Sequence, residues 1–164
     1  MNIATFLAQE LTIEAAGTLK TLSRVDFSHS DFAPHEKSMK FKALAIHVAE
    51  LLNWPARIIQ KDSLDFATDY GARPQFDTVE ELVAFAEKNI QETQAAFATW
   101  SEDDYETIWT LKHGDHIIMQ MPKAMAIRFI CQNHIIHHRA QLSVYLRMLD
   151  IPVPALYGPS ADEK

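Results

Sequence analysis

Cysteine is nearly absent from this 164-residue sequence, since Cys131 is the only one. A single cysteine cannot form a disulfide within the chain, so stability has to come from a packed core, and a reducing compartment is expected. Glycine is also scarce, because the sequence has four, and none belongs to a phosphate-binding glycine loop. This absence argues against a nucleotide-using enzyme.

Long apolar runs are lacking too. Charged residues interrupt even the apolar stretch AMAIRFICQNHIIHHR, which spans residues 124–139, whereas a membrane-spanning helix needs roughly 20 apolar residues. The N-terminal segment has no basic region before its apolar residues, and Glu10 and Glu14 follow closely, which does not suit a signal peptide. We therefore expect a cytoplasmic protein with no membrane partner.

Basic side chains are in the minority, with 15 against 22 acidic ones and a formal net charge of −7. No positive field attracts phosphate backbones, so nucleic acid is not an expected partner. The short cluster of Lys37, Lys40 and Lys42 is interpreted as a solvated face at a helix start. Hydrophobic residues make up 48% of the sequence and charged residues 23%, as in globular chains, and the length suits one domain over residues 1–164.

Apolar residues recur at helical spacing in four segments. The first segment runs from Ile3 to about Leu22. Ser38 can cap a second helix, in which Pro55 predicts a kink or an end near residues 53–54, because proline removes a backbone donor and crowds the preceding turn.

The second half of the chain predicts two more helices separated by a hairpin. Residues 61–77 form the longest connection and suggest a crossover, after which Thr78 and Glu81 make a capping-box pattern that begins the third helix. Strand-forming residues around a turn predict a short β-hairpin between residues 106 and 120. A proline in its first turn then begins a long fourth helix, expected over residues 122–149.

These elements predict an all-α fold: an up-and-down four-helix bundle with a long crossover connection and a short β-hairpin before the last helix. The proline-containing tail, residues 151–164, is expected to be extended and to pack on the bundle or on a second subunit. Bundles place metal sites on the inward faces of their helices, which directs attention to the histidines.

His134 and His138 lie four residues apart, so on a helix their side chains project from one face as neighbours. They interrupt an apolar stripe, and a buried imidazole without a partner is costly. The other members of that stripe are Ile127, Cys131, Gln141 or Leu142, Tyr145 and Leu149. Neutral imidazole is a good ligand for zinc, nickel, copper or iron, and such an ion would resolve the conflict.

His47 occupies the corresponding stripe of the second helix, between Leu44 and Leu51, and is the natural third ligand if the two helices face each other. Three histidines would leave an open coordination position for water or substrate. A histidine pair at this spacing is, by itself, more often a surface or satisfied core feature, and it is the addition of His47 that favours a metal site.

Other residues near this pattern have two interpretations each. Cys131 is either a soft ligand or a small buried hydrophobe, and core packing is preferred. Glu50 either orients a ligand or acts as a base, or it is a solvated carboxylate. His137 points away from His138 and is interpreted as a surface or supporting residue. The remaining histidines are expected in loops or in the hairpin: His29, His35, His113 and His116.

Missing motifs exclude two classes of metal protein. Ile135 follows His134, so the glutamate of the HExxH metalloprotease helix is lacking, and so are the Glu-x-x-His pairs of di-iron bundles.

Three stretches of the sequence together resemble a known family. They are Lys37-Ser-Met with Leu44-Ala-Ile-His-Val-Ala-Glu50, then His134-Ile-Ile-His-His-Arg-Ala-Gln-Leu-Ser-Val-Tyr-Leu-Arg147, and the tail from Pro152 to Glu163. These stretches are similar to the DinB family of metal-binding bundles, often grouped with bacterial thiol-dependent S-transferases. One departure is Ala140, where relatives frequently have glycine.

The resemblance implies a four-helix bundle, often a homodimer, in which His47, His134 and His138 bind nickel, zinc or a similar divalent ion such as iron, manganese, cobalt or copper. It also implies a reaction in which the open position binds a low-molecular-weight thiol for transfer to a small electrophilic molecule. Two alternatives stay open: metal-assisted hydrolysis or isomerisation of a small metabolite, and a non-enzymatic metal-binding stress-response protein.

Overall fold

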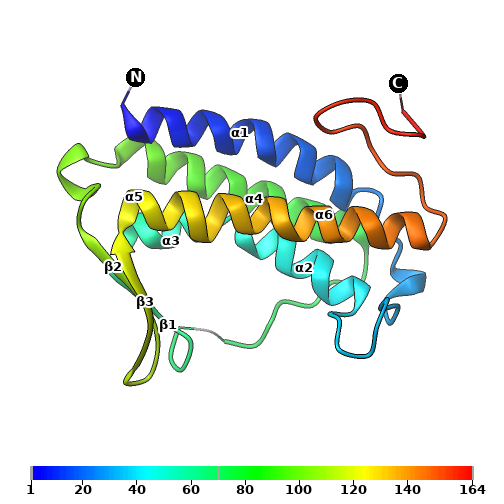
Figure 1. Cartoon of the computed structure of the whole chain (residues 1–164), viewed down its shortest axis with the longest axis horizontal. Coiled ribbons are helices and arrows are strands. Elements are labelled where there is room, and N and C mark those ends of the chain that lie inside the picture. The colour runs from blue at the N-terminus through cyan, green and yellow to red at the C-terminus, as the bar shows by residue number, and fades with distance from the viewer. Residues whose placement is uncertain (1, 70, 164) are drawn as a thin grey trace.

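Long helices run side by side along the molecule, and a small sheet lies at one end (Figure 1). This computed structural model describes residues 2–69 and 71–163. Its elements, in chain order, are α1 (Ile3–Leu22), the 3-10 turn η1 (Phe27–His29), α2 (Phe41–Leu51), α3 (Trp54–Gln60), β1 (Ser63–Asp65), α4 (Val79–Thr99), the 3-10 turn η2 (Glu102–Asp104), β2 (Ile108–His113), β3 (His116–Pro122), α5 (Lys123–Ala126), the π-helix η3 (Ile127–Gln132) and α6 (Asn133–Met148).

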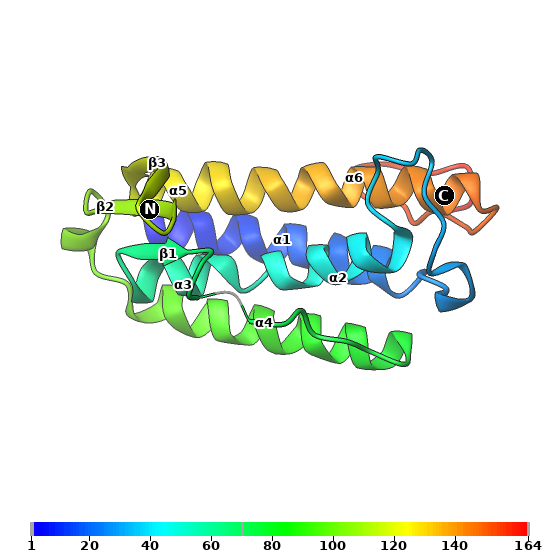
Figure 2. The ribbon, with the colours of Figure 1, turned by 90° about the horizontal axis from the view of Figure 1, so that it is seen from below.

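The helices pack in layers that Figure 2 shows along their length. Helix α1 lies against α4 and α6, while α2 contacts α6 on one side and α4 on the other. The core between them is apolar, and its largest fully buried side chains include Phe41, Leu44, Leu82, Ile135 and Leu142. Of the predicted all-α four-helix bundle with a hairpin, the mainly helical character and the hairpin are confirmed, whereas two of the four predicted helices are divided. Within the described residues, no helix is both long and apolar enough to cross a bilayer.

The predicted break in the second helix is confirmed. Helix α2 ends at Leu51, and α3 begins at Trp54 with Pro55 in its first turn. Proline is tolerated there because the amide hydrogen it lacks would have no partner within the helix. The break separates α2, which carries His47, from α3, which leads to β1.

The predicted cap of the second helix is wrong. Lys40, not Ser38, occupies the N-cap position, and no side chain caps the helix. The loop backbone takes over this role, because the amide of Phe41 donates to the carbonyl of Phe32 at 2.8 Å and that of Lys42 donates to Ser30 at 3.2 Å. With its first amides bonded to the preceding loop, the helix has no need of a serine cap.

The other two predicted helix starts hold. Helix α1 spans the expected residues and begins with Asn2, whose side chain accepts a hydrogen bond from Thr5. The capping box of α4 is formed: the amide of Glu81 donates to the Thr78 hydroxyl at 3.2 Å, and the Glu81 carboxylate accepts from the Thr78 amide at 3.4 Å.

The sheet has one strand more than the predicted hairpin. Strands β2 and β3 pair antiparallel as expected, and β1 adds to β2 in parallel within the connection predicted as a crossover. A strand of three residues is too short to show a periodicity. Asp65 stabilises it, since its Oδ1 accepts from the amides of Ala67 at 2.8 Å and of Gly114 at 2.9 Å. After β1 the chain returns along the bundle to α4 (Figure 1), as a crossover does.

The last predicted helix begins one residue later than expected and changes type along its length. Pro122 ends β3 and precedes the helix, which is α-helical over α5, π-helical over η3 and α-helical again over α6. A π-helical turn holds one extra residue and is frequent near functional sites. The apolar spacing of this segment did not reveal it. Helix α6 ends at Met148, and two residues later Asp150 has a left-handed φ of 58°, ahead of Pro152.

The tail packs on the bundle of its own chain. The Tyr157 hydroxyl donates to Glu14 at 2.8 Å, and Arg139, which is 2% exposed, contacts the same carboxylate at 2.6 Å. Gly17 lies close to this contact, because a Cβ there would be 3.1 Å from the Arg139 side chain and 3.2 Å from that of Leu156, so a larger residue would require these side chains to shift. Two further ion pairs, Arg24 with Glu163 and Arg147 with Asp162, attach the end of the tail.

Candidate metal centre

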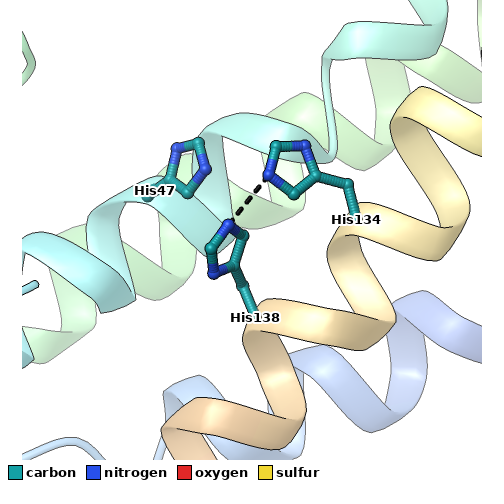
Figure 3. Close-up of side chains that lie close together, drawn as sticks. All are labelled: His47, His134 and His138. Carbon is teal, nitrogen blue, oxygen red and sulfur yellow. Dashed lines mark hydrogen bonds between the residues drawn. The ribbon is translucent and has the colours of Figure 1, made fainter. Parts of the chain in front are cut away.

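Packing of α2 against α6 brings three histidines together. His47 comes from α2, while His134 and His138 lie one turn apart on α6 and face it (Figure 3). One nitrogen from each ring lies within 4.8 Å of the corresponding nitrogen of the other two. In residues 2–69 and 71–163 this is the one group of at least three histidine, cysteine or acidic side chains so arranged. The predicted meeting of imidazoles from two helices is therefore observed.

The separations suit a single small ion. The Nε2 atoms of His134 and His138 are 2.8 Å apart, and the ring centroid of His47 lies 5.2 Å from that of His134 and 4.7 Å from that of His138. Imidazole nitrogens bind zinc at about 2.0–2.1 Å, which puts two ligands of a tetrahedral site roughly 3.3 Å apart. Small rotations of the rings would give this geometry.

Burial and mutual repulsion keep the rings of His134 and His138 neutral. The pKa of His134 is lowered from 6.5 to about 4, first by desolvation and then by the neighbouring His138 and His47. Desolvation is also the main cause that lowers the pKa of His138. Neutral imidazole carries the lone pair that a metal ion needs, so both side chains are in the ligand form at neutral pH.

Hydrogen bonds on the outer side of each ring determine which nitrogen faces the centre. His138 Nδ1 lies 2.7 Å from Gln141 Oε1, an acceptor, so Nδ1 carries the hydrogen. His134 hydrogen bonds with the backbone of Ile130, and its Nε2 faces His138, which leaves Nδ1 for that bond. With the hydrogen on Nδ1 of both rings, both Nε2 atoms present lone pairs, and a cation shared between them would relieve the repulsion.

Glu50 lies beside the third ring. Its Oε2 lies 3.9 Å from His47 Nδ1, and the side chain is 13% exposed, so it is not the solvated carboxylate of one sequence interpretation. This buried oxygen has no hydrogen-bond partner among the described residues. A carboxylate beside a ligating imidazole is the usual support of a metal site, because it accepts from the ring nitrogen that does not bind the ion. The orphaned oxygen and the facing lone pairs both fit a metal ion.

The remaining candidates lie elsewhere. Cys131 is fully buried, burial raises the pKa of its thiol well above the ordinary value, and it does not join the cluster, so the preferred core interpretation is confirmed. His137 is exposed, with its ring centroid 4.8 Å from that of His138. The four histidines predicted in loops or the hairpin are found there.

Two features of this site were not predicted from the sequence. Gln141 was placed only in the apolar stripe, yet it is exposed and hydrogen bonds to His138. Its spacing of three residues from His138 was a usable signal, since side chains three apart meet on a helix. The second feature is an apolar cavity beside His134, which combines residues from α3, the sheet and η3 and left no local pattern.

Several known proteins share this fold. The family model described as DinB family matches residues 3–164. The crystal structure of YjoA, a DinB-like protein of Bacillus subtilis, has 18% identity and a TM-score of 0.66, covering 92% of this chain and 96% of that one. A DinB-like protein of Bacillus cereus has 21% identity and a TM-score of 0.68, with 92% and 95% covered.

A curated protein shares a shorter stretch. The uncharacterized protein YrdA of Bacillus subtilis (strain 168) is 41% identical over 44 residues, which are 27% of this chain and 26% of YrdA. The stretch covers about a quarter of that protein.

Proposed function

The chain belongs to the DinB family, and from the geometry of its histidine cluster we propose that it is a metal-dependent enzyme. His47, His134 and His138 bind one divalent transition-metal ion, with nickel and zinc as the first candidates. In this proposal the chain works as a four-helix bundle, in which α2 with α3 and α5 with α6 each count as one interrupted helix. The observation that carries the proposal is the convergence of three imidazoles from two helices.

The side chains around the site have distinct roles in this proposal. Gln141 holds the His138 ring so that Nε2 faces the centre. Glu50 Oε2 lies 3.9 Å from His47 Nδ1, and in the metal-bound protein a small rotation of the ring would let this carboxylate accept from Nδ1. A bound divalent ion with an open position would lower the pKa of a coordinated thiol and so supply a thiolate nucleophile at neutral pH. In the proposed reaction this thiolate attacks a small electrophilic molecule, so that the whole low-molecular-weight thiol becomes joined to it through sulfur.

Metal content and turnover test this proposal separately. Protein purified without a metal-binding tag or chelators should contain about one transition-metal ion per chain by elemental analysis, and His47→Ala and His138→Ala should contain almost none. His116→Ala is the matched control, because that histidine is exposed at the start of β3. Metal-loaded protein is then incubated with bacillithiol, mycothiol, glutathione or coenzyme A and an electrophile. Absence of metal-dependent turnover with all four thiols discards the transferase reaction.

Glu50 favours a second candidate reaction. Its buried carboxylate oxygen lies near the cluster, at 3.9 Å from His47 Nδ1, where it can accept a proton from a water molecule. This arrangement suits metal-assisted hydrolysis or isomerisation of a small metabolite. A purely structural metal in a non-enzymatic protein is the third candidate, and saturation of the ion by protein ligands alone, measured by X-ray absorption spectroscopy, would favour it.

A further inference from the structure

An apolar cavity of about 390 Å³ opens beside the histidine cluster. It is lined by Trp54, Phe66, Leu111, Met119, Phe129, Ile130, Asn133, His134 and His137, and we call it the apolar cavity. Helix α3, the segment after β1, strands β2 and β3, and the helix from η3 to α6 each contribute to its wall. Six of its nine lining residues are apolar, and the volume lies within the range of small-molecule sites.

The cavity adjoins the candidate metal centre at one shared residue. His134 belongs to both, so a molecule in the cavity touches a ring that faces the centre. The ring of Trp54 lies edge-on to that of His134, with centroids 6.1 Å apart and an interplanar angle of 90°. Phe66 extends this aromatic wall, at 6.4 Å from Trp54. The wall therefore leads from the sheet to the histidines.

The π-helix places a large aromatic ring at this cavity. Phe129 lies in η3 and is 54% exposed, although its ring is apolar. Exposed apolar surface gathered around a cavity marks a binding site more often than scattered exposure does. The charged residues of the chain are absent from the lining, so an apolar and uncharged group is the one that this cavity accommodates.

We propose that the apolar cavity binds the substrate of the metal centre by an aromatic or branched aliphatic group, and so selects apolar electrophiles. This inference rests on the proposed function and adds its substrate class. With an aryl halide, the thiolate sulfur attacks the ring carbon, the carbon–sulfur bond forms, the carbon–halogen bond breaks and halide leaves. The thiol proton goes to solvent, so neither an oxidant nor a reductant is needed.

Dye binding tests the cavity without relying on turnover. The probe is N-phenyl-1-naphthylamine, an uncharged dye that fluoresces in apolar surroundings. The wild type should bind one dye per chain, and Phe129→Glu should weaken this binding by about tenfold or more, because it places a charge in the lining. Phe6→Glu is the matched control, since Phe6 is 52% exposed on α1 and does not line the cavity. It should bind the dye as the wild type does.

Two further measurements connect the cavity to the histidines and to the substrate class. One equivalent of Cu²⁺, which quenches nearby fluorophores, should quench the bound dye, whereas Zn²⁺ should not, and His138→Ala should abolish the quenching. The aryl electrophile 1-chloro-2,4-dinitrobenzene should displace the dye at concentrations at least about tenfold below those of chloroacetamide, a small polar electrophile.

The outcomes separate this inference from the proposed function. If the dye fails to bind the wild type, or if Phe129→Glu and Phe6→Glu weaken dye binding equally, the inference is overturned whether or not metal binds. If Phe129→Glu instead converts a dimer into a monomer by sedimentation while the dye does not bind the wild type, this face is an interface between copies and the inference also fails. If the dye binds in a way that depends on Phe129 but the protein binds no metal, the proposed function is overturned, while the proposal that the cavity is a binding site stands.

Discussion

The His138 ring is held between two partners, since its Nδ1 lies 2.7 Å from Gln141 Oε1 and its Nε2 lies 2.8 Å from His134 Nε2. The first contact makes Nδ1 the protonated nitrogen, and the second directs the free lone pair toward the centre of the cluster. An exposed glutamine thus determines which nitrogen of a half-buried histidine is available to a metal ion.

Replacement of Gln141 tests this relationship. Gln141→Leu should lower metal affinity by about 10- to 100-fold, the usual effect of losing the partner of a ligating histidine, while Gln141→Glu should retain the affinity because a carboxylate also accepts from Nδ1. Competition with a chelator of known affinity measures both. Gln60→Leu, on the exposed face of α3, is the control. Equal affinities for Gln141→Leu and the wild type would falsify the tautomer assignment.

Replacement of Glu50 should stabilise the metal-free protein and weaken metal binding. Glu50→Leu removes a buried oxygen that has no hydrogen-bond partner among the described residues, and this should raise the melting temperature of the metal-free protein by about 2–4 °C. The same change removes the support of His47 and should weaken metal binding by about tenfold or more. Calorimetry with and without one equivalent of Zn²⁺ measures both effects. A variant that loses stability in the metal-free state contradicts the assignment of that oxygen as unsatisfied.

Stability of the metal-free protein should depend on pH through His134. Its pKa is about 4 in the folded chain, below the value of 6.5 for an exposed histidine. Between these pH values the unfolded chain binds more protons, so the free energy of unfolding falls as pH is lowered from 6.5 to 4 and levels off below that. Denaturant unfolding at several pH values should show this slope, and His134→Gln should make it shallower. A slope unchanged in that variant would assign the pH dependence to other groups.

Metal binding should weaken over an acidic range for the same reason. Each ligating histidine must be neutral, so protons compete with the ion once the pH approaches the pKa of the free ring. The lowered pKa values of His134 and His138 keep this competition small at neutral pH. Titration of Zn²⁺-loaded protein with acid should therefore release the metal mainly below pH 6, detected with a zinc-sensitive dye. Release that is complete above pH 7 would show that the three rings are not the ligands.

Removing one partner of the buried pair of Arg139 and Glu14 should destabilise the fold strongly, whereas replacing both partners by apolar residues should change its stability little. Their closest atoms are 2.6 Å apart and both side chains are buried, so Arg139→Leu leaves a buried carboxylate without its cation and should destabilise the fold by about 3–5 kcal/mol. The double variant Arg139→Leu with Glu14→Leu should recover most of that loss. Urea unfolding measures the cycle. If the double variant is as unstable as the single one, lost packing rather than the unpaired charge is the cause.

The same pair should anchor the tail. Tyr157 bonds to both partners, so Tyr157→Phe removes two hydrogen bonds from the segment after α6 while leaving the ion pair in place. Amide hydrogen exchange in residues 151–163 should then be faster, with exchange in α1 unchanged. The Val153 and Ala155 amides are the ones to follow, since they donate to carboxylates of Asp162 and Glu163. Unchanged exchange there would show that the tail is held without Tyr157.

The elements that the sequence predicted correctly are those with local causes. The capping box of Thr78 and Glu81 lies within one helical turn, and proline disrupts the interior of a helix but not its first turn, so α4 and the division of α2 from α3 at Pro55 followed from the residues alone. The four-residue spacing of His134 and His138 likewise makes them neighbours on any regular helix. Ser38 failed as a cap because the competing partners, the carbonyls of Phe32 and Ser30, belong to a loop whose path depends on tertiary packing.

Length, charge and hydrophobic spacing by themselves determined a mainly helical chain with two histidines on one helical face and a third on another. Only the tertiary structure decided that α2 packs on α6 so that His47 completes the group, that β1 joins β2, and that the apolar cavity forms beside His134. The physical reason is the range of the forces involved. Helix signals act over one or two turns, whereas a site shared by separate elements depends on how their buried faces fit together.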